Sequence, residues 1–114
     1  MAEKRSDPRV KVSYPVLYSS HVYPRPKVGS TIDLSRGGAR IETPFSLIPG
    51  ETIEISIALN SQVIKCRGRV VSIFSLDGGR PAAGVQFEQI SRHDRLYLGE
   101  YISYLMDEET GKKE

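Results

Sequence analysis

The sequence predicts an all-β domain, a six-stranded antiparallel barrel followed by one C-terminal helix. Three observations support this prediction. Apolar and polar residues alternate over most of the chain, turn residues separate the alternating runs, and the apolar spacing becomes helical after Ile90. We expect the sheet to close, or nearly close, because closure removes the exposed edges that a flat sheet of this length would leave.

The first half of the chain is expected to form three strands, over residues 10–19, 27–33 and 39–42. In the first, Val and Tyr residues recur at every second position from Val10 to Tyr18. Pro15 lies within this run and indicates an edge position or a bulge. A proline-containing loop separates the first two strands, and Pro44 ends the third.

The second half is expected to form three more strands, over residues 52–59, 62–74 and 82–87. Pro49 and Gly50 predict a tight turn before the fourth strand, and a hairpin turn at residues 60–61 joins it to the fifth. The alternation in the fifth strand is imperfect at Gly68, which indicates a bulge. A loop at residues 77–81 leads to the sixth strand.

The helix is expected over residues 92–106, with one apolar stripe packed on the sheet. Ser91 and Asp94 have the spacing of a capping pair at its start. The stripe consists of residues at helical spacing, namely Leu98, Tyr101, Ile102 and Leu105.

Length and composition limit the function classes. With 114 residues the chain is about one domain long, and its net charge of +2 is too small for a general nucleic-acid binder. No apolar run approaches the ~20 residues that cross a bilayer, and no signal-peptide core is seen, so we expect a cytoplasmic protein without direct membrane insertion. The single cysteine, Cys66, excludes an internal disulfide and is expected to be a buried, inert thiol.

The chain is expected to divide into a flexible N-terminal arm, residues 1–9, and a barrel with its helix, residues 10–110. The arm is charged and lacks apolar periodicity. Arg5 and Arg9 lie four positions apart in it, and Pro8 disfavours a helix between them. In an extended arm this even spacing tends to place both guanidinium groups on one side.

An enzyme is hard to build from these residues. His21 and His93 lie near neither a cysteine nor a set of spaced carboxylates, and the sequence has no nucleophile elbow and no phosphate-binding loop with lysine. We therefore expect no catalytic residues, no metal site and no cofactor.

Binding chemistry centres on residues 33–38, Asp-Leu-Ser-Arg-Gly-Gly, between the second and third strands. By itself this stretch reads as an ordinary hairpin connection, in which glycines permit positive φ and close backbone approach. Arg5 and Arg9 can bind phosphate or the O6 and N7 edge of guanine. Asp33 can accept hydrogen bonds from guanine N1 and N2, and Ser35 adds a hydroxyl. Together they suit a phosphodiester that contains guanine.

These residues resemble the PilZ domain, the bacterial receptor family for cyclic di-GMP. The family pattern is R-x-x-x-R followed by [DN]-x-S-x-x-G. Residues 5–9 match its first part and residues 33–38 its second. Residues 38–43, the turn at 49–50 and residues 84–87 also correspond to family stretches, so the resemblance covers nearly the whole chain.

The resemblance implies that an arginine-containing arm folds over cyclic di-GMP while the central turn lines the other side. Arg5 and Arg9 would hold phosphates and guanine edges, Asp33 and Ser35 would hydrogen-bond a guanine, and Gly38 would keep the turn open. Further contacts are expected from Lys4, Arg36 and Gly37. Some family members stack a base on an aromatic residue of a late strand, and around Ser72 this chain has none.

We expect ligand phosphates to recruit the arm, and the closed arm to form a surface for an unidentified downstream protein. An adaptor that binds proteins without any ligand is the alternative. A small nucleic-acid-binding barrel is disfavoured by the low net charge and the lack of an aromatic row, so neither DNA nor RNA is expected as a partner. The sequence does not specify the downstream process, the affinity, the oligomeric state, or whether one ligand or a stacked pair binds.

Overall fold

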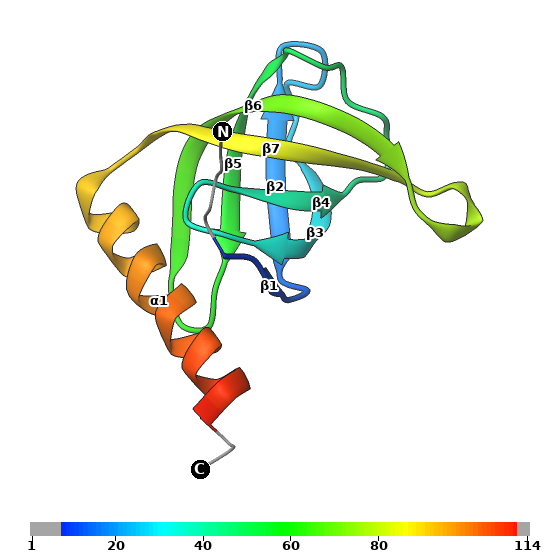
Figure 1. The fold of residues 1–114 in the computed structure, drawn as a ribbon. Helices are drawn as coiled ribbons and strands as arrows, with labels where there is room; N and C mark the ends of the chain where they lie inside the picture. The colour runs from blue at the N-terminus through cyan, green and yellow to red at the C-terminus, as the bar shows by residue number, and fades with distance from the viewer. Residues whose placement is uncertain (1–7, 112–114) are drawn as a thin grey trace, which may run out of the picture.

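The computed structural model describes residues 8–111 of the protein, which form an antiparallel barrel followed by one long helix (Figure 1). The strands of this part are β1 (Val10–Lys11), β2 (Pro15–Ser20), β3 (Lys27–Leu34), β4 (Gly38–Glu42), β5 (Thr52–Ala58), β6 (Val63–Ser75) and β7 (Pro81–Ile90). A 3₁₀ turn, η1 (Asp77–Gly79), separates β6 from β7, and the helix is α1 (Arg92–Gly111).

The barrel closes through antiparallel pairs alone. The strand order is β3-β2-β5-β6-β7-β4, and β4 then pairs with β3. The short β1 pairs with β3 beyond the end of β2, so β1 and β2 together occupy one position in the barrel. The predicted six-stranded barrel with a C-terminal helix is confirmed.

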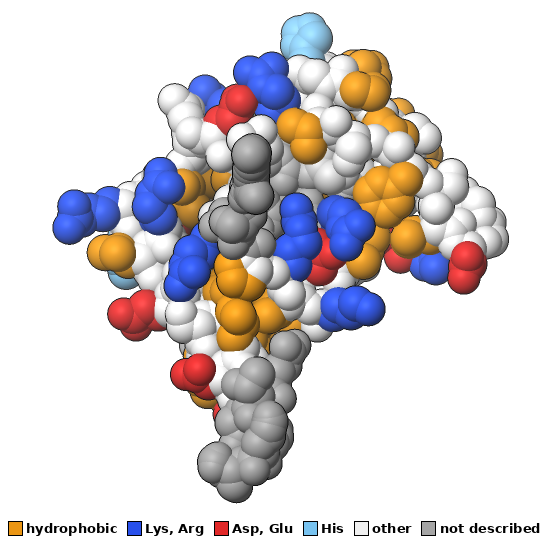
Figure 2. All heavy atoms as spheres, viewed as in Figure 1, with side chains coloured by type: hydrophobic (Ala, Val, Ile, Leu, Met, Phe, Trp, Pro, Cys, Tyr) orange, Lys and Arg blue, Asp and Glu red, His pale blue; other side chains and the backbone are white. Residues whose placement is uncertain are grey.

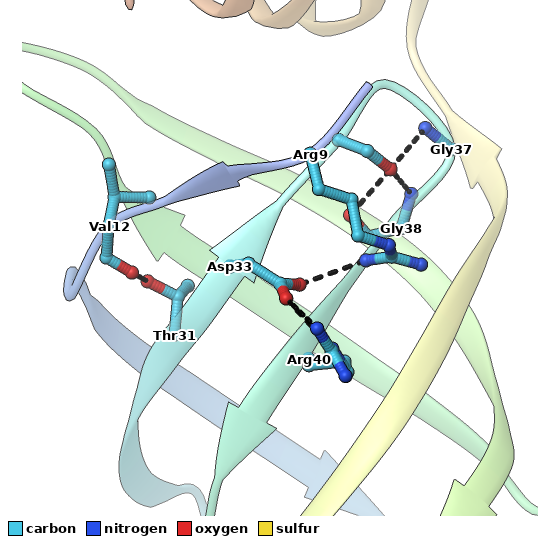
Figure 3. Close-up of polar contacts among 8 residues, drawn as sticks. Arg9, Val12, Thr31, Asp33, Gly37, Gly38 and Arg40 are labelled. Atoms are coloured by element: carbon cyan, nitrogen blue, oxygen red, sulfur yellow. Dashed lines mark hydrogen bonds and ion pairs between the residues drawn. The ribbon is translucent and has the colours of Figure 1, made fainter. Parts of the chain in front are cut away.

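The first strand is interrupted between β1 and β2, where residues 12–14 oppose residues 31–32 of β3 and add one extra residue. Thr31 bridges this bulge with its side chain. Its hydroxyl accepts a hydrogen bond from the Tyr14 amide at 2.9 Å. It also donates one to the Val12 carbonyl (Figure 3). The single strand expected over residues 10–19 is therefore two strands, with a bulge of the kind that the proline indicated.

A second irregularity was expected at Gly68, and the register between β6 and β7 does shift between Arg67 and Gly68. The extra residue there belongs to β7 and is Glu88. The same pair of strands shifts again at Val71, which is an extra residue of β6. These two bulges let β6 and β7 curve around the barrel.

The core fills the barrel interior, where alternate strand residues point inward and are almost fully buried. α1 adds Leu98 and Ile102 to it, as the helical spacing predicted. The Ser91 hydroxyl accepts a hydrogen bond from the Asp94 amide at 3.1 Å and caps the helix. The Asp94 carboxylate instead accepts one from the Lys65 amide at 3.0 Å, which ties the start of α1 to β6. The helix continues to Gly111, beyond the expected end.

Cys66 lies in β6 and is buried, as predicted. Burial above all, with Asp94 and Glu54 adding to it, raises the pKa of the thiol to about 12. At pH 8 the thiol is then almost entirely protonated and therefore unreactive. We expect iodoacetamide at pH 8 to leave Cys66 unmodified in the folded protein and to alkylate it in urea, as measured by intact mass. Equal labelling under both conditions would contradict this.

Candidate ligand-binding site

The turn between β3 and β4 is fixed by its own serine and by β7. The Ser35 amide donates to the Gly38 carbonyl at 2.9 Å, and the buried Ser35 hydroxyl accepts from the amides of Gly37 and Gly38 at 3.2 Å each. The Phe87 amide of β7 donates to the Gly37 carbonyl at 2.8 Å. The turn is thus held on two sides, and the polar groups near it keep fixed positions.

Gly38 is required by close packing of the barrel. A Cβ atom at this position would lie 2.2 Å from the carbonyl oxygen of Val85, a backbone atom of the neighbouring strand. Neither Gly37 nor Gly38 is among the glycines with positive φ, so the turn does not use the positive φ that these glycines permit. Gly38 instead allows β4 to lie close to β7.

Asp33 lies in β3, between β1 and β4, and its side chain is only 3% exposed. Its Oδ1 accepts a hydrogen bond from Arg9 Nη1 at 2.9 Å, and its Oδ2 accepts from Arg40 Nε at 2.8 Å and from Arg40 Nη2 (Figure 3). The two arginine side chains are about half exposed, at 47% and 46%. A buried carboxylate is therefore oriented by two cations that reach solvent.

β1 explains how Arg9 reaches the central turn. Arg9 directly precedes β1, whose two residues pair with Leu34 and Asp33 at the end of β3. Because of this pairing, the Arg9 side chain lies within hydrogen-bond distance of the Asp33 carboxylate. Lys4 and Arg5, the other arm residues predicted for the site, lie outside the described residues.

Arg40 is a residue of the candidate site that the sequence did not predict. It is the direct cross-strand partner of Asp33, and Leu34 is likewise paired with Ala39. A hairpin closed between Ser35 and Gly38 must place Asp33 opposite Arg40, because pairs in an antiparallel hairpin are equidistant from the turn. Counting outward from the turn would therefore have found Arg40 in the sequence.

A pocket of about 550 Å³ lies beside this group, a size within the range of small-molecule sites, roughly 300–1,000 Å³. Its lining residues come from β4, β6, β7, the central turn and the segment before β1: Arg9, Ser35, Gly37, Gly38, Arg40, Val71, Ser72, Gly84, Val85 and Gln86. None of these described residues is aromatic. Figure 2 shows Lys and Arg side chains gathered beside a carboxylate on this face of the molecule.

Arg36 lies apart from this pocket. Its guanidinium group donates to the Ser103 hydroxyl at 2.9 Å and the Gly99 carbonyl at 3.4 Å, so it connects the central turn to α1. Of the predicted residues, four line the pocket: Arg9, Ser35, Gly37 and Gly38. Asp33 is ion-paired with the two arginines of the lining, Arg9 and Arg40. The Arg36 side chain instead contacts α1.

The chemistry of this group suits an anionic ligand. Two guanidinium groups can form paired hydrogen bonds with phosphate oxygens, and serine hydroxyls and an amide side chain add neutral donors and acceptors. Within residues 8–111, no cluster of three or more His, Cys, Asp or Glu side chains is arranged to hold a metal ion. In the same part of the chain, no helix is both long and apolar enough to cross a membrane.

Comparison with solved structures reveals the same fold in several bacterial proteins. The PilZ domain of YcgR from Escherichia coli, solved with c-di-GMP, has a TM-score of 0.77 at 17% identity and covers 97% of this chain and 98% of its own. YcgR from Escherichia coli in complex with c-di-GMP has a TM-score of 0.81 at 19% identity, and covers 98% of this chain and 50% of its own. The inhibitor of motility MotI/DgrA from Bacillus subtilis has a TM-score of 0.80 at 18% identity, and the match covers 92% of this chain and 53% of MotI/DgrA.

The chain thus spans about half the length of MotI/DgrA and of the longer YcgR structure. A search of curated proteins found no match. The family profile described as the PilZ domain matches residues 3–104, which is most of the chain. The protein therefore belongs to the PilZ domain family.

Proposed function

We propose that this protein is a receptor for the second messenger cyclic di-GMP and passes the signal to a partner protein when its N-terminal arm closes over the ligand. The observation that carries the proposal is the buried Asp33 between two half-exposed arginines at the edge of a pocket. Membership of the PilZ family and the YcgR complexes with c-di-GMP support the choice of ligand.

The hydrogen bonds of Asp33 suggest how the ligand enters. Both carboxylate oxygens are already bound, and little of the side chain is exposed. A guanine that donates its N1 and N2 hydrogens to this carboxylate must therefore displace a donor. Arg9 binds Asp33 less strongly than Arg40 does, because Arg9 donates one hydrogen bond to the carboxylate and Arg40 donates two. In this proposal Arg9 leaves Oδ1 for a ligand phosphate, and its place is taken by the guanine.

Closure of the arm is the proposed signal. If Arg5 and Arg9 both bind phosphates, residues 5–9 become ordered on the ligand. Hydrogen–deuterium exchange is then expected to show slower amide exchange in a peptide covering these residues when cyclic di-GMP is added. Equal exchange with and without the ligand, at saturation, would contradict the closing arm while leaving binding itself intact.

Isothermal titration with cyclic di-GMP tests the receptor function directly, with GTP and GMP as controls. We expect saturable binding of cyclic di-GMP and at least about tenfold weaker binding of either mononucleotide, because a mononucleotide offers one guanine and no bridging phosphodiesters. The stoichiometry will distinguish one ligand from a stacked pair. No heat, together with an unchanged melting temperature, would reject the proposal and favour an adaptor that binds proteins without ligand.

A further inference from the structure

Arg40 has a position that no other described arginine shares. Its guanidinium group is hydrogen-bonded to Asp33, lies over the ring of Phe74 at 5.9 Å, and borders the pocket. The hydrogen bonds to Asp33 above all raise the pKa of Arg40, whose guanidinium group is charged in any case. It extends from β4, which is paired with β3 on one side and β7 on the other. The guanidinium is thus a flat cation fixed on a rigid strand.

We propose that Arg40 is a ligand-contacting residue of this site and that a guanine base of the ligand stacks on its guanidinium group. This inference rests on the proposed binding of cyclic di-GMP. A guanidinium group is planar and weakly hydrated, and it stacks on aromatic rings and on nucleobases. The guanidinium group of Arg40 contacts both Phe74 and Asp33, while 46% of the Arg40 side chain remains exposed.

The composition of the pocket supports this role. The described residues that line it include no aromatic ring, and the nearby Phe74 ring lies against the Arg40 guanidinium group. Arg9 and Arg40 are the arginines among them, and they are held differently. Arg9 makes one hydrogen bond to Asp33 from the segment before β1, whereas Arg40 makes two and also lies over Phe74. Arg40 is therefore suited to remain in place as a platform while Arg9 changes partner.

Titrations of Arg40→Ala and Arg40→Lys with cyclic di-GMP test the inference. Removing a stacked, charged contact in Arg40→Ala is expected to weaken binding about 10- to 100-fold. Arg40→Lys should restore little of this affinity, because lysine keeps the positive charge but has no planar group on which a base can stack. Arg69→Ala is the matched control, since Arg69 is a half-exposed strand arginine paired with Glu88 and lies outside the pocket. Its affinity should stay within about twofold of wild type.

Two measurements separate direct contact from an effect through Asp33. Phe74→Leu removes the ring beneath Arg40 without touching the hydrogen bonds to Asp33, and it should weaken binding about two- to fivefold. Nuclear Overhauser effects should connect the guanine H8 proton with the Arg40 δ-methylene protons in the wild-type complex. Melting temperatures of all variants will show that they are folded.

The outcomes distinguish this inference from the proposal on which it rests. A wild-type protein that gives no binding heat would overturn both. Wild-type binding with unchanged affinity in Arg40→Ala would overturn the role of Arg40 alone. Full affinity in Arg40→Lys, or the absence of any Overhauser effect between Arg40 and guanine, would overturn the stacking contact.

Discussion

Asp33→Ala is expected to lower the affinity for cyclic di-GMP about 100-fold while the barrel stays folded. A carboxylate that accepts two guanine hydrogens is worth roughly 1–3 kcal/mol, and each 1.4 kcal/mol is tenfold in affinity. The variant also leaves Arg9 and Arg40 unopposed, and these cations attract any phosphate. We therefore expect selectivity over GTP to fall together with affinity, as measured by parallel titrations.

The Asp33→Ala variant should stay folded because the two arginines that lose their partner are far more exposed than Asp33 itself. Removing one partner of a buried pair is costly when the charge left behind is buried. Here the carboxylate is 3% exposed and the arginines are 47% and 46% exposed, so the charges left behind can be hydrated. The melting temperature should change by only a few degrees. Arg40→Ala leaves the buried carboxylate with one partner and should destabilise the barrel more.

Asp33→Asn is the matched control for binding. The amide keeps one oxygen for an arginine, and asparagine is an accepted residue at this position of the family motif. The Asn variant should therefore bind cyclic di-GMP better than the Ala variant. An Asp33→Ala protein that is folded and binds with wild-type affinity and selectivity would show that the ligand lies elsewhere.

The barrel could be predicted from the sequence because the residue pattern determines which face of each strand is buried. Val16 and Tyr18 are buried and Leu17 is exposed, as strict alternation requires. The break between β1 and β2 could not be placed in the same way. It depends on the Thr31 hydroxyl of β3, which is paired with both strands and bonds to the Tyr14 amide and the Val12 carbonyl across the break.

The residues gathered at the candidate site could be predicted only in part, and the reason differs from residue to residue. Asp33 and Ser35 could be found because their motif is local in sequence. Arg36 was expected at the ligand because it lies inside that motif. In the structure its guanidinium group is hydrogen-bonded to Gly99 and Ser103 of α1, a contact that neighbours in sequence do not reveal. Arg40 lies just outside the motif, and only the pairing of β3 with β4 brings it to Asp33.

Gly38→Ala is expected to destabilise the barrel by at least about 3 kcal/mol, a large share of the roughly 5–15 kcal/mol by which a domain is stable. The new Cβ would lie 2.2 Å from the Val85 carbonyl oxygen and 3.3 Å from the Gln86 Cα atom. Both are backbone atoms of β7 that cannot rotate away, so β4 and β7 must separate. The melting temperature should fall by about 12 °C or more.

Gly79→Ala provides the control for this prediction. Gly79 has a φ of 79° and no atom within 4 Å of its would-be Cβ, so alanine there carries backbone strain without a clash. That strain should cost only about 1 kcal/mol. If Gly38→Ala proved no less stable than Gly79→Ala in urea unfolding, β7 would be able to yield at this point. The position of the turn against β7 would then not depend on glycine, and the role of Gly38 would have to lie in ligand binding, as the family motif implies.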